Sequence, residues 1–265
     1  MQQTFFRSFA GQLYRSVMHP TQRRMPVSPW RALVGLPVVF DLVSLVMQTA
    51  DHRRTLRIKD TYAVDDAHHR MVQNYNAEVT LNKVFTSTRR FDIYYKLLAL
   101  PPRDLAIEKL LIVGPRNRPE LLSAWCHGFR WRNIDAIDLF SANPKIRIMN
   151  MEAMTWPDES FHAVSMSNTL SYAEDTQRVV NEVARVLKPG GRFAFSVSYV
   201  PKAERWKEEV VGGDLIADFL HSAGFEIEIH QATDKINSVG ERQTSHAFMA
   251  RKLPPGEKRL DPFKL

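Results

Sequence analysis

The segment from Asp158 to Ser198 constrains the fold of this chain more than any other stretch. It holds an apolar run over His162–Asn168, then a polar-flanked helical stretch, then a second apolar run over Gly191–Val197. Before the second run, Pro189 fixes φ and Gly190 accepts a positive φ, which suits a type II turn and ends the helix. The pattern therefore predicts a strand, a helix, a tight turn and a strand, in that order.

The same alternation of strands and helices extends over most of the chain from residue 105 onward. Strands that alternate with helices indicate right-handed βαβ units, in which a mainly parallel sheet carries helices on both faces. We predict an α/β fold of the Rossmann-like, doubly wound kind, with a seven-stranded, mainly parallel sheet and an N-terminal, mostly helical extension. The predicted strands are 109–114, 133–139, 145–149, 162–168, 191–197, 225–230 and 244–251, and the clearest helices are 119–125 and 215–222.

Two adjacent prolines, Pro101 and Pro102, mark the predicted domain boundary. We expect a basic, mostly helical extension over residues 1–100, the α/β domain over residues 101–253, and a C-terminal tail over residues 254–265. The single cysteine, Cys126, excludes an internal disulfide framework and any multi-cysteine metal site. We predict no metal site.

The net positive charge of the chain lies in its first hundred residues. Residues 1–100 hold 14 of the 36 Lys/Arg and 7 of the 29 Asp/Glu, which accounts for the whole net charge of +7. No acidic residue precedes Asp41. Such asymmetry indicates an anionic partner, such as a membrane surface, a nucleic acid or an anionic glycan. A solvated basic tail is the alternative.

Two N-terminal segments bear on a membrane. Phe6 to Val17 has the spacing of a short amphipathic helix, which would lie on a membrane surface or dock on the parent domain. Residues 32–49 are the most apolar stretch, but Asp41 near its centre would cost about 2.5–3.5 kcal/mol on insertion. We therefore expect a buried or partner-facing helix that starts near Pro37, and a cytoplasmic protein with peripheral membrane contact. An Arg-rich start also fits mitochondrial import if the source is eukaryotic.

Ligands of such sheets bind beyond the carboxyl ends of the strands, where the strand order reverses. The first strand there ends at Gly114, where a glycine allows a tight turn and a close approach of the backbone to a ligand. Asp138 ends the second strand, and a carboxylate at that place can accept hydrogen bonds from both hydroxyls of a ribose.

Residues 105–252 resemble the class I S-adenosylmethionine-dependent methyltransferases, and the type 11 group in particular. The resemblance rests on Gly114, on Asp138 and on the run Arg-Val-Leu-Lys-Pro-Gly-Gly over residues 185–191. It implies S-adenosylmethionine as the cofactor. It also implies that Asn150 and Met151 contact adenine and that two strand-end residues lie beneath the methionine part. The implied cofactor-binding residues are Gly114, Pro115, Asp138, Leu139, Asn150, Met151, Ser167 and Asn168.

The first turn departs from the glycine-rich pattern of this family. Ile112 stands where the family has an acid, and Arg116 and Arg118 stand where it has further glycines. Arginine side chains at these positions could fill the cofactor space, and their charge would repel a sulfonium if they pointed inward. Where these arginines point therefore separates an active enzyme from a silent relative.

The resemblance implies in-line methyl transfer to a small molecule or a glycan. The alternative is a catalytically silent binding or scaffold protein with a basic N-terminal region that contacts a membrane or another partner. The fourth strand is followed by Ser167-Asn168-Thr169-Leu170 and not by an Asn-Pro-Pro-Tyr motif, which argues against methylation of a base amino group, and we do not expect a nucleic-acid partner. The sequence assigns no catalytic base. The polar candidates at the substrate mouth are Tyr172, Glu174, Asp175 and Tyr199, followed by Lys202, Arg205 and Trp206 in the next loop.

Overall fold

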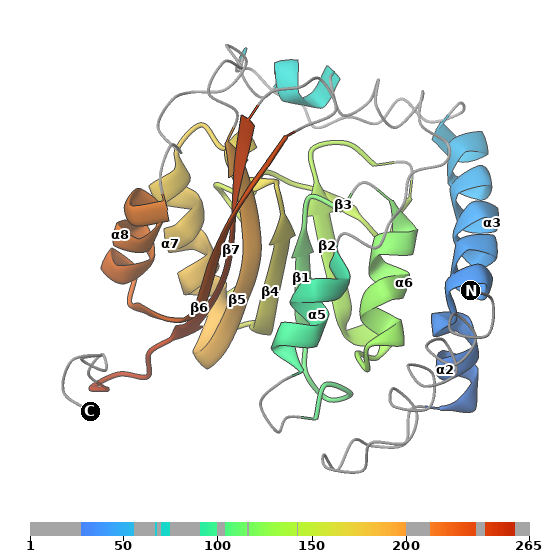
Figure 1. The fold of residues 1–265 in the computed structure, drawn as a ribbon, viewed down its shortest axis with the longest axis horizontal. Helices are drawn as coiled ribbons and strands as arrows, with labels where there is room; N and C mark the ends of the chain where they lie inside the picture. The colour runs from blue at the N-terminus through green and yellow to red at the C-terminus, as the bar shows by residue number, and fades with distance from the viewer. Residues whose placement is uncertain are drawn as a thin grey trace, which may run out of the picture.

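The computed structural model of the chain describes residues 28–55, 67, 70–74, 91–99, 104–115, 117–141, 143–199, 213–236 and 242–257 (Figure 1). The strands are β1 (Leu110–Val113), β2 (Ile134–Asp138), β3 (Arg147–Ile148), β4 (Phe161–Ser167), β5 (Leu187–Tyr199), β6 (Phe225–Ile236) and β7 (Arg242–Lys252). The helices are α2 (Pro29–Gly35), α3 (Pro37–Thr55), α5 (Asp92–Leu98), α6 (Arg118–Cys126), α7 (Thr176–Val186) and α8 (Gly213–Ser222).

The seven strands form one sheet in the order β3-β2-β1-β4-β5-β7-β6. β1 to β5 pair in parallel, whereas β7 lies antiparallel between β5 and β6. This confirms the predicted α/β fold and its mainly parallel sheet. The turn glycine Gly190 has φ +74°, as the type II turn requires. β5 begins at Leu187 and not at Gly191, because Leu187 already pairs with Phe161 ahead of a register shift.

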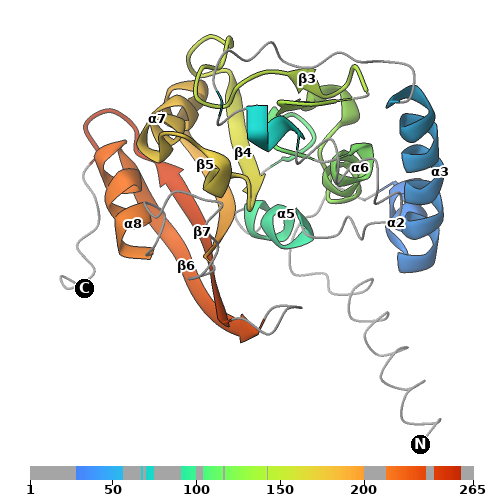
Figure 2. The same ribbon diagram turned by 90° about the horizontal axis from the view of Figure 1, so that it is seen from above.

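Alternate residues of the central strands face two different helical layers. Leu111 and Val113 of β1 belong to the hydrophobic cluster that α7 and α8 cover. Leu110 and Ile112 of the same strand belong to the cluster under α5 and α6. Figure 2 shows the two pairs of helices on opposite sides of the sheet. Both faces of the parallel strands are therefore buried, which explains their continuous apolar sequences.

Helix α5 lies in the core although it precedes the predicted domain boundary. Phe91, Tyr95 and Leu98 are almost fully buried, and they pack in the same cluster as Leu110 of β1. Tyr95 stacks on Phe91 with a centroid distance of 6.0 Å. The boundary near residue 101 stays a prediction, and the N-terminal part of the chain supplies one helix of the α/β layer structure.

Helices α2 and α3 lie outside α6, at the edge of the molecule (Figure 1). α3 begins at Pro37, as the sequence predicted, since proline is favoured in the first turn of a helix. Among the described residues, no single helix is long and apolar enough to cross a membrane, although α2 and residues 37–51 of α3 pass that test together as a pair bent by 84°. The predicted helix over Phe6 to Val17 lies outside the described residues.

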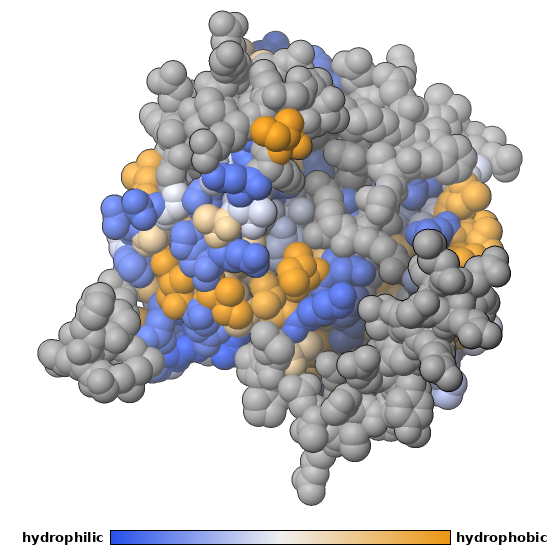
Figure 3. Space-filling model, viewed as in Figure 1, coloured by the Kyte–Doolittle hydropathy of each residue, from blue (hydrophilic) through white to orange (hydrophobic). Residues whose placement is uncertain are grey.

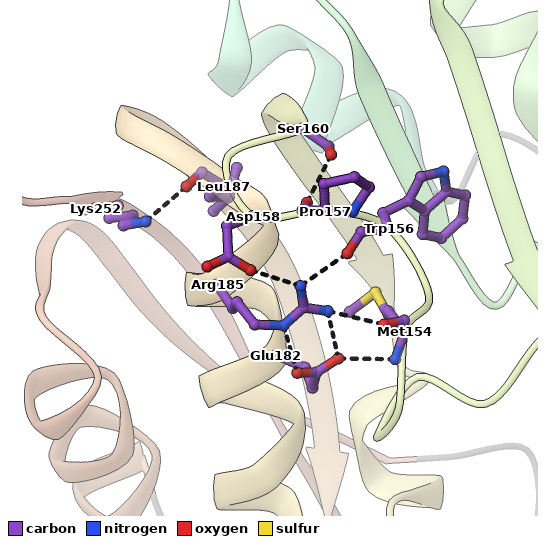
Figure 4. Close-up of polar contacts among 9 residues, drawn as sticks. All are labelled: Met154, Trp156, Pro157, Asp158, Ser160, Glu182, Arg185, Leu187 and Lys252. Atoms are coloured by element: carbon purple, nitrogen blue, oxygen red, sulfur yellow. Dashed lines mark hydrogen bonds and ion pairs between the residues drawn. The ribbon is translucent and has the colours of Figure 1, made fainter.

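Arg185, near the end of α7, fixes the loop that leads into β4 (Figure 4). Its guanidinium donates to the carboxylates of Asp158 and Glu182 at 2.8 Å. It also donates to the carbonyl oxygens of Met154 and Trp156, both at 2.8 Å. The hydrogen bonds from Arg185 lower the pKa of Glu182 below its usual range. One side chain thus holds two carboxylates and two backbone carbonyls, which ties residues 154–158 to α7.

Candidate cofactor site at the carboxyl edge of the sheet

The turn after β1 is closed by Gly114 and by a side chain from the turn after β4. Gly114 has φ +69°, and its N–H donates to the carbonyl oxygen of Ile137 at 2.8 Å. A Cβ placed on Gly114 would lie 2.8 Å from the Cβ of Thr169 and closer still to the rest of that side chain. Only glycine therefore fits this position, both for its conformation and for its space. The sequence prediction of a tight turn at Gly114 is confirmed.

Asp138 ends β2 beside this turn. Because Val113 pairs with Ile137, the residues that follow them, Gly114 and Asp138, lie next to each other at the carboxyl edge. The Oδ1 atom of Asp138 accepts from the N–H of Phe140 at 3.3 Å, so the carboxylate is oriented by its own turn. Leu139 follows, and its carbonyl oxygen accepts from the side chain of Gln73 at 2.9 Å. A half-buried carboxylate next to a glycine turn is the arrangement that the sequence predicted.

Asn150 and Met151 follow β3 on the same edge. The Oδ1 atom of Asn150 accepts from the N–H of Glu152 at 2.8 Å, which closes a turn. Met151 is half-buried and packs on the cluster under α7 and α8. Glu152 is 5% exposed, and its carboxylate accepts from the N–H of Glu174 in the turn after β4. The adenine side of the predicted site is thus connected to the β4 turn.

The end of β4 carries a buried polar network. Asn168 has φ +54°, a conformation that asparagine tolerates better than most residues. Its Oδ1 atom accepts from Ser198 at 2.9 Å and from Ser196 at 3.2 Å. Tyr94 of α5 donates to Ser196 at 2.6 Å, and Ser167 is 2% exposed. Hydrogen bonds that connect α5 and β5 to Asn168 therefore fix its position at the end of β4.

Arg118, the first residue of α6, is held by two residues of α3. Its Nε donates to Oδ2 of Asp51 at 2.8 Å, and its Nη2 donates to the carbonyl oxygen of Met47. The other carboxylate oxygen of Asp51 accepts from Asn143 at 2.8 Å. Asn143 lies in the loop that follows Asp138. A single buried acid of α3 thus connects the two loops of the predicted cofactor site. Arg116 lies outside the described residues.

Asn117 is a candidate site residue that the sequence analysis did not identify. It caps α6 without a hydrogen bond from its side chain, and its Oδ1 atom is buried with no hydrogen-bond partner among the described residues. A buried acceptor of this kind suits a ligand that brings a donor. Pro115, which was predicted as a contact, is buried in the same turn. The only sequence signal for Asn117 was its place between two arginines in the first turn.

The structure gives the predicted residues at the substrate mouth different environments. Asp175 caps α7 and accepts from the N–H of Arg178 at 2.9 Å, so it has a structural role. Glu174 is exposed and Tyr172 is half-buried, both in the turn after β4. The side chain of Tyr199 lies outside the described residues, as do Lys202, Arg205 and Trp206.

The family model described as a methyltransferase domain matches residues 131–195. Among solved structures, the chain is similar to a Haloferax volcanii complex of the Trm112 methyltransferase activator and a methyltransferase, with a TM-score of 0.50, 13% identity, and coverage of 72% of this chain and 100% of the other. An S-adenosylmethionine-dependent methyltransferase from Methanosarcina mazei has a TM-score of 0.42 and 18% identity, with 56% and 93% covered. A protein from Bacillus halodurans described as a methyltransferase has a TM-score of 0.48 and 16% identity, and the match covers 62% of this chain and 99% of the other. No curated protein matches.

Residues 131–195 match the methyltransferase domain model, and the order of the sheet is that of a Rossmann-like methyltransferase fold. S-adenosylmethionine is the cofactor that this match implies. The match begins shortly before β2, so it leaves out the Gly114 turn. The described residues of that turn fit the cofactor, because among the described residues Asn117 offers a buried acceptor without a hydrogen-bond partner, and the charge of Arg118 is paired with Asp51. The individual cofactor contacts stay predictions.

Proposed function

We propose that this protein is an active S-adenosylmethionine-dependent methyltransferase that acts on a small molecule or a glycan by in-line methyl transfer. The observation that carries the proposal is the convergence of three turns on one edge of the sheet. Gly114 and Asp138 lie side by side there, and the turn after β4 contacts Gly114 through Thr169.

Three residues of this edge, Asp138, Asn117 and Asn150, would each contact a different part of the cofactor. The carboxylate of Asp138 accepts hydrogen bonds from ribose hydroxyls. The buried Oδ1 atom of Asn117 accepts from the ammonium of the methionine part. Asn150 lies in the turn that would border adenine. When bound, the cofactor supplies an electrophilic methyl group.

Electrostatics support this proposal as well. A guanidinium over the glycine turn would repel a cationic sulfonium. The contact between Arg118 and Asp51 pairs that charge at 2.8 Å with a carboxylate of α3. The protein's main contribution is then to hold two reactants at attack distance. A general base is needed only for an acceptor that must lose a proton.

The charge distribution supports a small molecule or a glycan over a nucleic acid. All of the net charge of +7 lies in residues 1–100, so the methyltransferase domain is balanced in charge. Proteins that bind nucleic acid depend on many Lys/Arg contacts to phosphates. A domain without a net positive charge lacks that contribution.

Isothermal titration of the full chain with S-adenosylhomocysteine tests the proposal. We expect binding by the wild type and an affinity at least about tenfold weaker in Asp138→Ala, because hydrogen bonds to a charged group are lost. Asp218→Ala removes an exposed carboxylate of α8 and is the matched control, with unchanged affinity. No heat with the wild type would contradict cofactor binding, and equal affinities of the two variants would contradict the role of Asp138.

The acceptor class has its own test. The protein is incubated with S-adenosylmethionine labelled in its methyl group and with separate pools of glycans, small metabolites and RNA. We expect label in a glycan or small-molecule pool and not in RNA. Label in RNA alone would overturn the acceptor class while leaving cofactor binding in place.

A further inference from the structure

Helix α3 exposes a row of apolar side chains and buries several polar ones on its opposite side. Val38, Leu42 and Val46 repeat every four residues and therefore share one face. They are 71%, 58% and 69% exposed. The side toward α6 instead buries Ser44 and Asp51. A surface helix of a globular protein normally buries its apolar stripe and exposes its polar one.

Helix α2 extends this apolar surface around the bend of 84° between the two helices. Trp30 is 67% exposed, and the side chains of Leu33 and Leu36 are 41% and 40% exposed. Figure 3 shows hydrophobic surface along the edge that α3 forms in Figure 1. We define the α2–α3 apolar face as the exposed side chains of Trp30, Leu33, Leu36, Val38, Leu42 and Val46.

The orientation of α3 is fixed by its polar side. Asp51 binds Arg118 and Asn143, each at 2.8 Å, and Phe40 on the same side of α3 is 3% exposed. A rotation that buried the apolar stripe would break both contacts and leave a buried charge unpaired, which is costly. The apolar face is therefore held outward by the fold.

The sequence on either side of this face indicates what covers it. Between Ser28 and Asp51 the only exposed charged residue is Asp41, so the face itself is nearly uncharged. In sequence, the stretch is flanked by Arg23-Arg24 on one side and Arg53-Arg54 on the other. An apolar face between basic flanks suits a bilayer with anionic headgroups, since each Lys or Arg near such a surface contributes about 1 kcal/mol.

We propose that the α2–α3 apolar face docks this protein on the surface of an anionic lipid bilayer. The apolar side chains enter the interface, and the basic sequence on either side favours anionic headgroups. The sharp bend suits two helices that lie in the interface. This contact does not depend on the methyltransferase activity and is tested without cofactor.

Co-sedimentation of the full chain with phosphatidylcholine vesicles, with or without phosphatidylglycerol, tests the proposal. The variant Val38→Ser/Leu42→Ser/Val46→Ser removes the centre of the face. We expect it to bind anionic vesicles about a hundredfold more weakly than the wild type, since three aliphatic side chains no longer leave water. The matched control is Ile107→Ser/Ile236→Ser, which changes side chains that are 64% and 67% exposed elsewhere.

The proposal predicts that wild type and control bind anionic vesicles alike, that neutral vesicles bind less, and that added salt weakens binding. Absence of wild-type binding to anionic vesicles would overturn it, and so would equal losses in variant and control. Sedimentation velocity supplies the remaining outcome. A wild-type dimer that the triple variant converts to monomer, without vesicle binding, would show that a second copy covers this face and would also overturn the proposal.

Discussion

Two loops beside the central strands are held in place in different ways. The loop before β4 is fixed by Arg185, whose partners all lie within 31 residues of it in sequence. The turn at the start of α6 is fixed by Asp51, which lies 67 residues from Arg118 and 92 residues from Asn143. The first set of contacts lies inside the segment that matches the family model, residues 131–195. The second set depends on a helix outside that segment.

The difference explains how this chain can depart from the glycine-rich pattern and keep the turn. Arg118 stands where the sequence analysis expected a glycine, and α3 holds its guanidinium with an acid and a backbone carbonyl. Helix α3 therefore supports the start of α6, although it precedes the predicted domain boundary.

Replacing Arg185 should cause the largest loss of stability. Arg185→Leu leaves Glu182 and Asp158 without their cation and two loop carbonyls without a donor. We expect the free energy of unfolding in urea to fall by about 3 kcal/mol. Arg132→Leu is the control, because Arg132 is exposed and lies outside the loop that leads into β4. Equal losses in the two variants would contradict the role of Arg185 as a clamp.

Breaking the α3 contact should cost somewhat less. Asp51→Leu leaves Arg118 and Asn143 without their shared acceptor, and we expect a loss of about 2–3 kcal/mol. The double variant Asp51→Leu/Arg118→Met should lose less than the sum of the single variants, because the two residues act on one contact. Asp41→Leu changes an exposed acid of the same helix and should be nearly neutral. Strict additivity in urea unfolding would argue against the contact.

Gly114→Ala should cost about 2 kcal/mol, because it adds a clash with Thr169 to an unfavourable positive φ. Gly190→Ala separates these two causes. Gly190 has φ +74° but no atom within 4 Å of an added Cβ, so it reports the conformational cost alone. The midpoint temperature of thermal unfolding should be lower for Gly114→Ala than for Gly190→Ala. Equal midpoints would show that the approach of the β4 turn to Gly114 has no energetic weight.

The smallest expected effect lies outside both parts, on β6. Burial lowers the pKa of His230 from 6.5, as does the neighbouring charge of His246, while Asp214 opposes the shift. Because the folded state binds this proton less readily than the unfolded chain, the stability from His230 is present above about pH 6.5 and is lost as the pH falls below that value. As the pH is lowered below about 6.5, the urea midpoint of the wild type should therefore fall more steeply than that of His230→Gln. Parallel curves would contradict this reading.

The fold was predictable from sequence because its signals are local. Apolar runs, Pro189 and Gly190 each specify structure within a few residues, and Asp138 could be placed because it ends a strand. The direction of Arg118 could not be predicted, since its partner Asp51 lies on a helix far away in sequence. The burial of the Asn117 Oδ1 atom likewise depends on tertiary packing.

A crystal structure of the full chain with S-adenosylhomocysteine tests the central claim most directly. The account predicts the ribose hydroxyls on the carboxylate of Asp138, the amino group at the Oδ1 atom of Asn117, and Arg118 still bound to Asp51. A structure in which Arg118 leaves Asp51 and fills the space beside Gly114, with no ligand at this edge, would contradict it.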